Sequence, residues 1–351
     1  MMTFAGSDDD AFALNAPVAG QIKDAQVKGN PVVLRSVLGY VAASRASQGS
    51  AQAFMDATKF LIANMLRSMA KKIEIEMLYG QAGYGTIAAS TTAASSFVVT
   101  TSEWAPGIWA GAEGLTVEFR DVTGTTSRGE FVITSVNMET RAITIATTAT
   151  LTAGDTIWHK GAYGNEFVGV HNILSQTTGT LFNINVGQYN LFRGNQYDAG
   201  TAALSFTKLN LAAARAVEKG LEGKLVAMVN PRGWANMLSD QAALRKYDGS
   251  YSKKSLENGT EKLVFFSQNG EIEIVPSIYV KEGYAYMLSI EDFVRVGSTD
   301  MTFNRPGSGD QIFRELENAA GFELRLYTDQ ALFNSAPGRS VLIKNIVNSN
   351  S

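Results

Sequence analysis

The chain has 351 residues, of which 45% are hydrophobic and 18% are charged, a balance that supports one large or two modest folded domains. The net charge of −3 lacks the basic excess of proteins that hold nucleic acid through its phosphates. The absence of cysteine excludes disulfides, thiolate catalysis and cysteine-based zinc sites, and two histidines cannot form a three-histidine metal centre.

The first twenty residues are small, acidic and without periodicity, and they include Asp8, Asp9 and Asp10. They have neither the basic start nor the apolar run of a secretory signal. No stretch of the chain approaches the ~18 apolar residues that span a membrane. We therefore expect a soluble protein, made in a cytoplasm, with residues 1–20 as a flexible arm.

Two extended-looking runs, 21–28 and 32–41, flank the turn signal Gly29-Asn30-Pro31. Neither run has the apolar density of a core hairpin. Because a lone two-stranded hairpin is marginal in water, the pattern predicts a projecting hairpin over 21–48 that needs a partner surface.

The strongest periodicity lies in residues 50–79, where apolar side chains recur every three or four positions and charged ones fall on the opposite face. This predicts an amphipathic helix of about 45 Å, longer than most globular helices. Gly80 follows as a stop signal. The apolar positions are Phe54, Ala57, Leu61, Met65, Met69, Ile73 and Met77.

A β pattern follows, after a Gly-, Ala-, Ser- and Thr-rich segment (81–96) that we expect to be a loop. Short alternating runs, bounded by Gly, Asp or Asn, predict a small barrel or sandwich over 97–165, inserted between mixed segments. The runs are 115–119, 131–134, 142–146 and 156–158, and residues 137–141 form a hairpin loop between two of them.

The remainder of the chain is predicted to mix helices with strands, and Gln268-Asn269-Gly270 marks a hairpin turn between two of the strands. The expected helices are 206–219 and 232–246, and the expected strands are 224–229, 262–266, 271–275, 284–290, 323–333 and 340–347.

Motifs that suggest chemistry have simpler interpretations. The glycines of 80–85 follow a helix and lack the Gly-Lys-Ser/Thr ending of a phosphate loop, so a helix stop and a loop are favoured. Residues 306–310 form a surface-turn pattern. His171 has no evident carboxylate partner, and no Gly-x-Ser-x-Gly elbow supports a catalytic triad. We predict no catalytic residues, no metal and no cofactor.

The order of acidic arm, projecting hairpin, long helix and mixed region resembles the major capsid proteins of tailed bacteriophages, which have the Hong Kong 97-type fold. The likeness extends over roughly 20–347 and is carried by residues 76–83, 270–276 and 321–333. It implies an α+β fold with an N-terminal arm, an extended loop, a long spine helix and peripheral and axial domains, to which a small β-barrel-like domain is added.

The resemblance also implies a division of the chain. The expected parts are an arm (1–20), an extended-loop hairpin (21–48), the spine helix and start of the peripheral domain (49–96), an inserted β domain (97–165), more peripheral domain (166–204), an axial domain (205–300), and a peripheral strand that returns to the axial domain (301–351).

The function implied is that of a virion shell protein that is assembled in the bacterial host cytoplasm. Copies would form hexamers and pentamers of an icosahedral head around double-stranded DNA, touched only by weak non-specific contacts. Since only about fifty residues precede the long helix, the resemblance implies a separate scaffolding protein, besides a portal protein and decoration proteins.

Charge suggests inter-subunit contacts. The three aspartates give the arm −3, whereas the hairpin region has four cations against Asp24, which gives +3. We predict that the arm, or an acidic face of a neighbour, pairs with this loop and sets registry more than stability. The cations are Lys23, Lys28, Arg35 and Arg45.

Three alternatives stay open. An encapsulin-type compartment shell has a related fold, although the inserted β domain argues against it. A tube or fibre protein of a virion is disfavoured by the long helix. A hydrolase is disfavoured by the lack of a convergent acid, base and nucleophile.

Overall fold

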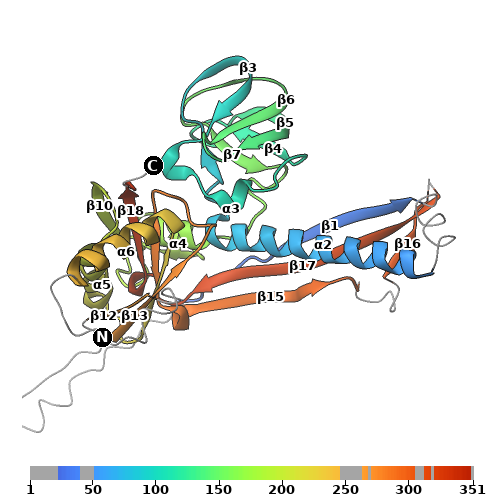
Figure 1. Cartoon of the computed structure of the whole chain (residues 1–351). Coiled ribbons are helices and arrows are strands. Elements are labelled where there is room, and N and C mark those ends of the chain that lie inside the picture. The colour runs from blue at the N-terminus through green and yellow to red at the C-terminus, as the bar shows by residue number, and fades with distance from the viewer. Residues whose placement is uncertain are drawn as a thin grey trace, which may run out of the picture.

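The computed structural model describes residues 23–39, 51–245, 263–267, 270–304, 312–317 and 320–348. Figure 1 shows a long rod, a mixed α/β body at one end of it, and a separate β domain above the point where rod and body meet. Within the described ranges, no helix combines the length and apolarity that crossing a membrane requires.

The rod is a two-layer structure of one helix on one sheet. The predicted long helix is confirmed as α2, Ala51–Tyr79, and its buried Met65, Met69 and Ile73 pack on Leu324 and Leu326 of the sheet. The antiparallel sheet has the order β1-β17-β15, with β16 also on β17. Its strands are β1 Asn30–Gly39, β15 Phe293–Thr302, β16 Phe313–Glu315 and β17 Gly321–Asn334.

The predicted hairpin over 21–48 is wrong for the residues that the structure describes. Asn30 and Pro31 do not form a turn but begin β1, which pairs with β17 from Asn30↔Gln330 to Gly39↔Gly321. The alternation of this strand places Val32 and Leu34 toward α2 and the intervening side chains outward. Pro31 is tolerated because β1 is an edge strand. The segment thus folds onto its own chain.

The β domain is a six-stranded sheet of order β2-β7-β4-β5-β6-β3. Its two ends are joined by a bridge between Ile87 and Val99 and by hydrogen bonds from Ala88 N to Val98 O (2.9 Å) and from Thr100 N to Thr86 O (2.8 Å). The strands are β2 Gly85–Thr86, β3 Thr91–Val98, β4 Thr116–Arg120, β5 Ser127–Asn137, β6 Ala142–Leu151 and β7 Thr156–His159, and α3 Pro106–Trp109 lies at the base.

All four predicted runs of this domain are strands, and the hairpin at 137–141 is confirmed. The predicted loop over 81–96 is wrong, because β2 and β3 lie within it, and the sheet therefore begins at Gly85 and not at 97. The misassignment has a physical reason: β3 exposes most of its small side chains and has little apolar alternation.

The body is a six-stranded sheet of order β10-β18-β14-β11-β13-β12, with two helices packed on it. The predicted helices and strands of this region are confirmed, including the β12–β13 hairpin, whereas β10 was not predicted. The elements are α5 Phe206–Glu218, α6 Pro231–Arg245, β10 Gln196–Ala202, β11 Leu225–Val229, β12 Leu263–Ser267, β13 Gly270–Pro276, β14 Ala285–Leu288 and β18 Val341–Ile346.

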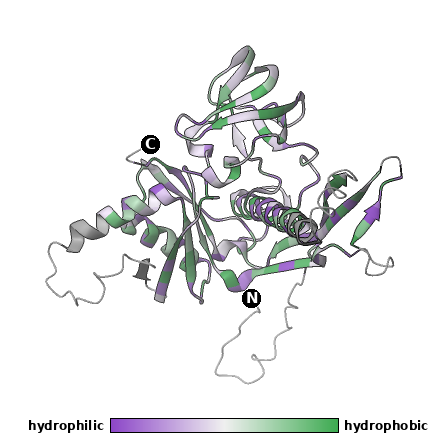
Figure 2. Cartoon of the chain, turned by 45° about the vertical axis from the view of Figure 1, so that its right-hand side comes forward, coloured by the Kyte–Doolittle hydropathy of each residue, from purple (hydrophilic) through white to green (hydrophobic). Residues whose placement is uncertain are grey.

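The link between the β domain and the body holds α4 Val170–Ser175 and the short pair β8 Thr180–Leu181 and β9 Ile184–Asn185. One hydrophobic core runs from the end of α2 through this link into the β domain, and separate cores fill the body and the rod. Figure 2 shows the corresponding green bands along the strands of the body and pale stretches in the β domain.

Candidate functional site: the junction beneath the β domain

One segment of the chain, beginning at Gly80, leads from the end of α2 into the β domain, and a second, ending at Gly169, leads out of it. The backbones of these two passages are in contact. Gly169 N donates to Gly80 O at 2.9 Å, and a Cβ added at Gly80 would lie 2.1 Å from Phe167 O. The helix does end at Tyr79, as the sequence predicted, but the left-handed residue is Gln81 (φ 64°). Gly80 is therefore required for close approach and not for its torsion angles.

A buried ion pair joins the base of the β domain to the body. Lys281 Nζ lies 2.6 Å from Glu103 Oε2 and donates to Gly83 O at 3.1 Å, while Tyr284 OH donates to Glu103 Oε1 at 2.7 Å. Lys281 is only 2% exposed. Burial by itself would raise the pKa of Glu103, but the charge and hydrogen bond of Lys281 hold it below its usual value.

Aromatic side chains complete this first cluster. The hydroxyl of Tyr79 accepts from the backbone N–H of Lys281 at 2.8 Å, and Tyr286 OH shares a 2.9 Å hydrogen bond with His171 Nδ1. Burial, then the charge of Lys281, lowers the pKa of His171 to about 4, so its imidazole is neutral at pH 7. The neutral imidazole of His171 packs against the rings of Tyr79 and Tyr284.

A second cluster lies on the other side of the rod end. Lys72 on α2 forms an ion pair with Glu166 and donates to Tyr84 OH at 2.7 Å, and Tyr84 OH in turn donates to Glu166. Glu76, one turn further along α2, accepts from Phe167 N at 3.2 Å and lies 4.0 Å from Lys72 Nζ. Two buried carboxylates therefore share a single lysine.

This imbalance changes the acidity of both carboxyl groups. Desolvation raises the pKa of Glu76 to about 7. The positive charge of Lys72 opposes this shift, and the negative charge of Glu166 adds to it. Burial also raises the pKa of Glu166. One buried oxygen of each carboxyl group lacks a hydrogen-bond donor in the structure. The pair is thus arranged to retain a proton near neutral pH.

The other histidine has a structural place as well. His159 packs on Tyr84 with ring centroids 4.3 Å apart, and burial, then the nearby lysines, lowers its pKa well below the usual value. Among the residues that the structure describes, no three histidine or acidic side chains come together as metal ligands.

Sequence reasoning missed both clusters, since their members are spread from residue 72 to residue 286. The only local sign was the density of tyrosines and acidic residues around the helix end and around 279–286.

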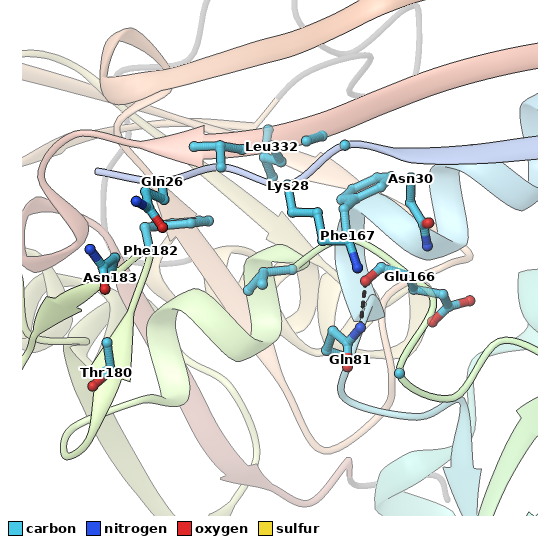
Figure 3. Close-up of a pocket in the computed structure, with 15 residues that line it drawn as sticks. Gln26, Lys28, Asn30, Gln81, Glu166, Phe167, Thr180, Phe182, Asn183 and Leu332 are labelled. Atoms are coloured by element: carbon cyan, nitrogen blue, oxygen red, sulfur yellow. Dashed lines mark hydrogen bonds between the residues drawn. The ribbon is translucent and has the colours of Figure 1, made fainter. Parts of the chain in front are cut away.

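An open cleft of about 620 Å³ lies beside the second cluster, between residues 26–30, the passage 164–168 and the end of β17. Figure 3 shows Lys28 extending across it toward Glu166 and Phe167, with Phe182 and Leu332 on the far side. Its polar lining includes Lys28, Glu166 and Thr180.

The predicted contact residues divide into three groups. Asp8, Asp9, Asp10 and Arg45 lie outside the described residues. Lys23 and Lys28 are exposed, as a contact role requires.

Arg35 differs from these, because it binds Glu323 of its own chain with 2.7 Å between Nη2 and Oε2. Arg325 binds the same carboxylate, and hydrogen bonds from Arg325 and then Arg35 hold the pKa of Glu323 below its usual range. The ion pair of Arg35 therefore joins β1 to β17 within one subunit.

No protein-family model matches the chain, and no curated protein matches it in sequence. Among solved structures, the capsid asymmetric unit of cyanophage A-1(L) is similar over 98% of this chain and 85% of that chain, with a TM-score of 0.56 and 13% identity. The chain has the Hong Kong 97-type capsid fold. The resemblance predicted from the sequence is thereby confirmed for the fold.

Two further structures with the Hong Kong 97-type fold are similar along nearly the whole chain. The capsid of a native GTA particle covers 99% of this chain and 82% of its own, with a TM-score of 0.46 and 11% identity. The procapsid of satellite phage P4, which includes the size determination protein, covers 98% and 80%, with a TM-score of 0.43 and 8% identity.

Proposed function

We propose that this chain is a major capsid protein, whose copies form hexamers and pentamers of an icosahedral head around phage double-stranded DNA. The observation that carries the proposal is the likeness to the cyanophage A-1(L) capsid, which extends along 98% of this chain. The role is structural and not enzymatic, in agreement with two half-buried histidines whose imidazoles are neutral at pH 7.

The rod supports self-assembly. Among the residues that the structure describes, α2 covers one face of its sheet, and the other face carries four valines that are each about half exposed: Val33 (52%), Val37 (50%), Val294 (49%) and Val296 (43%). A monomer in water gains nothing from such an aliphatic face. A subunit in a lattice covers it, and obligate interfaces of thousands of Å² are built from surfaces of this kind.

The fold allows parts of the chain to be assigned in capsid terms. We assign α2 as the spine helix, the β1-β17-β15 sheet as the peripheral domain and the sheet around β14 as the axial domain. The barrel over 85–159 is assigned as an inserted domain, and 1–20 as the arm. Residues 30–39 belong to the peripheral sheet, so an extended loop would be confined to the rest of 21–48.

The proposed partners are copies of the chain, a separate scaffolding protein, a portal protein and decoration proteins. A chain of net charge −3 fits weak, non-specific contact with the packaged DNA, because tight phosphate binding needs a basic surface. The proposed location of the protein is the virion, after assembly in the bacterial host cytoplasm.

The charge pairing between the acidic arm and the loop remains part of the proposal. Lys28 is its cleanest probe, since Arg35 also holds Glu323 within the subunit. If Lys28→Glu together with Arg35→Glu assembles with normal yield and normal salt sensitivity, the pairing is wrong.

Electron microscopy of the overexpressed chain, with and without its scaffolding protein, tests the proposed function. Closed shells are expected. A compact monomer at high concentration in both preparations would overturn the proposal, and filaments would favour a tube or fibre protein. Nuclease-protected DNA in particles purified from the virus would distinguish a phage head from an encapsulin-type compartment.

A further inference from the structure

Three basic side chains lie together at the C-terminal end of α5. Arg193 precedes β10, Arg215 is in the last turn of the helix, and Lys219 is its C-cap. Burial, then the positive charges of Arg193 and Arg215, lowers the pKa of Lys219, so the three groups are close enough to repel one another. In the described part of the chain, no acidic side chain forms an ion pair with any of them. We call these three residues the basic cluster.

The two arginines of the basic cluster are held in place by backbone oxygens. Arg193 Nε donates to Thr177 O at 2.9 Å. Arg215 donates to Gln196 O, and its Cζ lies 5.4 Å from the centroid of the Tyr197 ring. A guanidinium group has five N–H donors, so each arginine keeps donors for an anion in a geometry that is already fixed.

An open cleft of about 420 Å³ borders the basic cluster. Arg215 and Lys219 line it, and Glu218 is the one acidic residue in its described lining. Three positive charges against one negative charge give the site +2. Leu191, 54% exposed, accepts from Gly338 N at 3.0 Å, and a Cβ added at Gly338 would lie 3.1 Å from Lys219 Cδ. The site thus combines positive charge with an adjoining aliphatic side chain.

The chain itself contains a segment of matching chemistry. Asp8, Asp9 and Asp10 are its only run of three consecutive acidic residues, and residues 1–22 contain no basic one. Phe12 follows two positions later, so the segment combines negative charge with an apolar side chain. Carboxylates are also the groups that guanidinium side chains bind with two parallel hydrogen bonds. Charge and apolar content therefore both favour this segment as the ligand of the basic cluster.

The arm also joins the described structure close to the cluster. Gln26 N donates to Phe182 O at 2.9 Å, which places the first described residues against the β8–β9 pair. Thr177, the acceptor at the cluster, precedes Phe182 by five positions and is at most about 18 Å from it. Asp10 precedes Lys23 by thirteen positions, which can span about 43 Å when extended. The three aspartates can therefore reach the basic cluster of their own subunit.

We propose that, in the unassembled subunit, Asp8–Asp10 of the arm dock on the basic cluster of the same chain. The carboxylates receive hydrogen bonds from the remaining guanidinium donors and compensate the charge of Lys219, while Phe12 packs beside Leu191. This docking holds whether or not the chain forms a shell. It also leaves the arm available to the loop of a neighbour after assembly.

Cleavage within the arm of the purified, unassembled full-length chain tests the docking. Chymotrypsin cleaves after Phe12, and mass spectrometry follows the rate of this cleavage at low salt. The cluster variants are Arg193→Glu, Arg215→Glu and the two combined. Lys59→Glu with Arg67→Glu is the matched control for the combined variant, since it makes the same change of charge at two exposed positions on α2.

We expect slow cleavage of the wild-type chain and roughly tenfold faster cleavage of each cluster variant, the loss that a few partly exposed ion pairs produce. High salt should accelerate cleavage of the wild-type chain in the same way. The control should match the wild type. Far-UV circular dichroism and a melting curve establish which variants are folded, and one folded cluster variant suffices.

Exchanging the charges shows whether the arm touches the cluster directly. The triple arm variant should also be cleaved faster, and combining it with the double cluster variant should restore slow cleavage. Its changes are Asp8→Lys, Asp9→Lys and Asp10→Lys. Unchanged cleavage in the folded cluster variants, or no recovery in the combined chain, would overturn the docking.

Two further outcomes would assign the arm to another place. Faster cleavage of Lys28→Glu, with no effect of the cluster variants, would place the arm on the loop and overturn the inference. Protection that rises with protein concentration would mean that the arm docks on a second copy, which overturns docking within one chain. None of these measurements requires a shell, so the proposed function is tested separately by electron microscopy.

Discussion

Lys281 and Glu103 are separated by 178 residues in the chain, yet the ammonium group lies 2.6 Å from the carboxylate in a site where Lys281 is 2% exposed. The pair joins the base of the β domain to the loop before β14. Backbone hydrogen bonds from Glu282 N to Trp104 O (2.9 Å) and from Gly283 N to Ser102 O (2.8 Å) flank it. A buried ion pair and backbone hydrogen bonds thus join the β domain to the body.

Removal of the lysine should therefore destabilise the chain strongly. Lys281→Met leaves Glu103 buried without its counter-charge, and the free energy of unfolding should fall by about 3–5 kcal/mol. Urea unfolding of the unassembled chain measures it. Arg295→Ala is the control, because the Arg295–Asp300 pair is largely exposed and should contribute less than about 1 kcal/mol. Equal losses for the two variants would contradict the structural role of the buried pair.

The buried carboxyl pair of Glu76 and Glu166, beneath the β domain, predicts that stability depends on pH. The pKa of Glu76 is raised by burial from 4.5 to about 7, so its stabilising effect is complete below the unfolded value and is lost as the pH rises through about 7. Glu76→Gln should remove this loss and raise stability at pH 8 by about 1–3 kcal/mol, since one pKa unit corresponds to about 1.4 kcal/mol.

Melting curves between pH 5 and 8 provide the measurement. The wild-type chain should lose stability over this range, and Glu76→Gln should show a flatter dependence. Glu139→Gln, at an exposed hairpin position, should leave the wild-type slope unchanged. An identical slope in the Glu76 variant would show that the carboxyl group does not titrate in this range.

Because the two passages between the rod and the β domain are in backbone contact, we predict that Gly80 cannot be replaced by a residue with a side chain. In Gly80→Ala the methyl group would meet Phe167 O and Glu76 O, at 2.1 and 2.7 Å before any adjustment. Both are backbone atoms, so we expect a loss of about 1–3 kcal/mol or failure to fold. Gly39→Ala, with no atom within 4 Å of the added carbon, should change stability by less than about 0.5 kcal/mol. Thermal melts of both variants compare the two sites.

The packing of the rod predicts that two substitutions on α2 have different effects on the free energy of unfolding. Met69 is 1% exposed between α2 and the sheet, so Met69→Ala should cost about 2–5 kcal/mol through lost burial and the cavity left behind. Phe60 on the same helix is 75% exposed, and Phe60→Ala should have little effect on the unassembled chain. Denaturant titrations measure both, and a large effect at Phe60 would mean that the helix packs differently.

Elements with a strong local pattern were predictable from the sequence. The apolar spacing from Met65 to Met77 predicts α2, and the alternation of residues 323–333 predicts β17. β3 and β15 illustrate the limit, because both are largely exposed and lack apolar alternation. For β3 the serine and threonine content favoured a loop, and only its pairing with β6 makes it a strand.

The candidate site could not be predicted in the same way. Lys72, Glu76 and Glu166 approach one another only because Gly80 and Gly169 let the two passages touch. His171 had no visible partner in the sequence, while the structure places Tyr286 at 2.9 Å from it and Glu103 near enough to influence its pKa.

By itself, the sequence determined the order and type of the main elements, because periodicity and composition act over a few neighbouring residues. Only the tertiary structure decided that residues 30–39 pair with β17, that the two ends of the β-domain sheet meet at Ile87 and Val99, and that Lys281 reaches Glu103. Strand partners and buried charges depend on contacts between residues far apart in the chain, whose free energy no local pattern records.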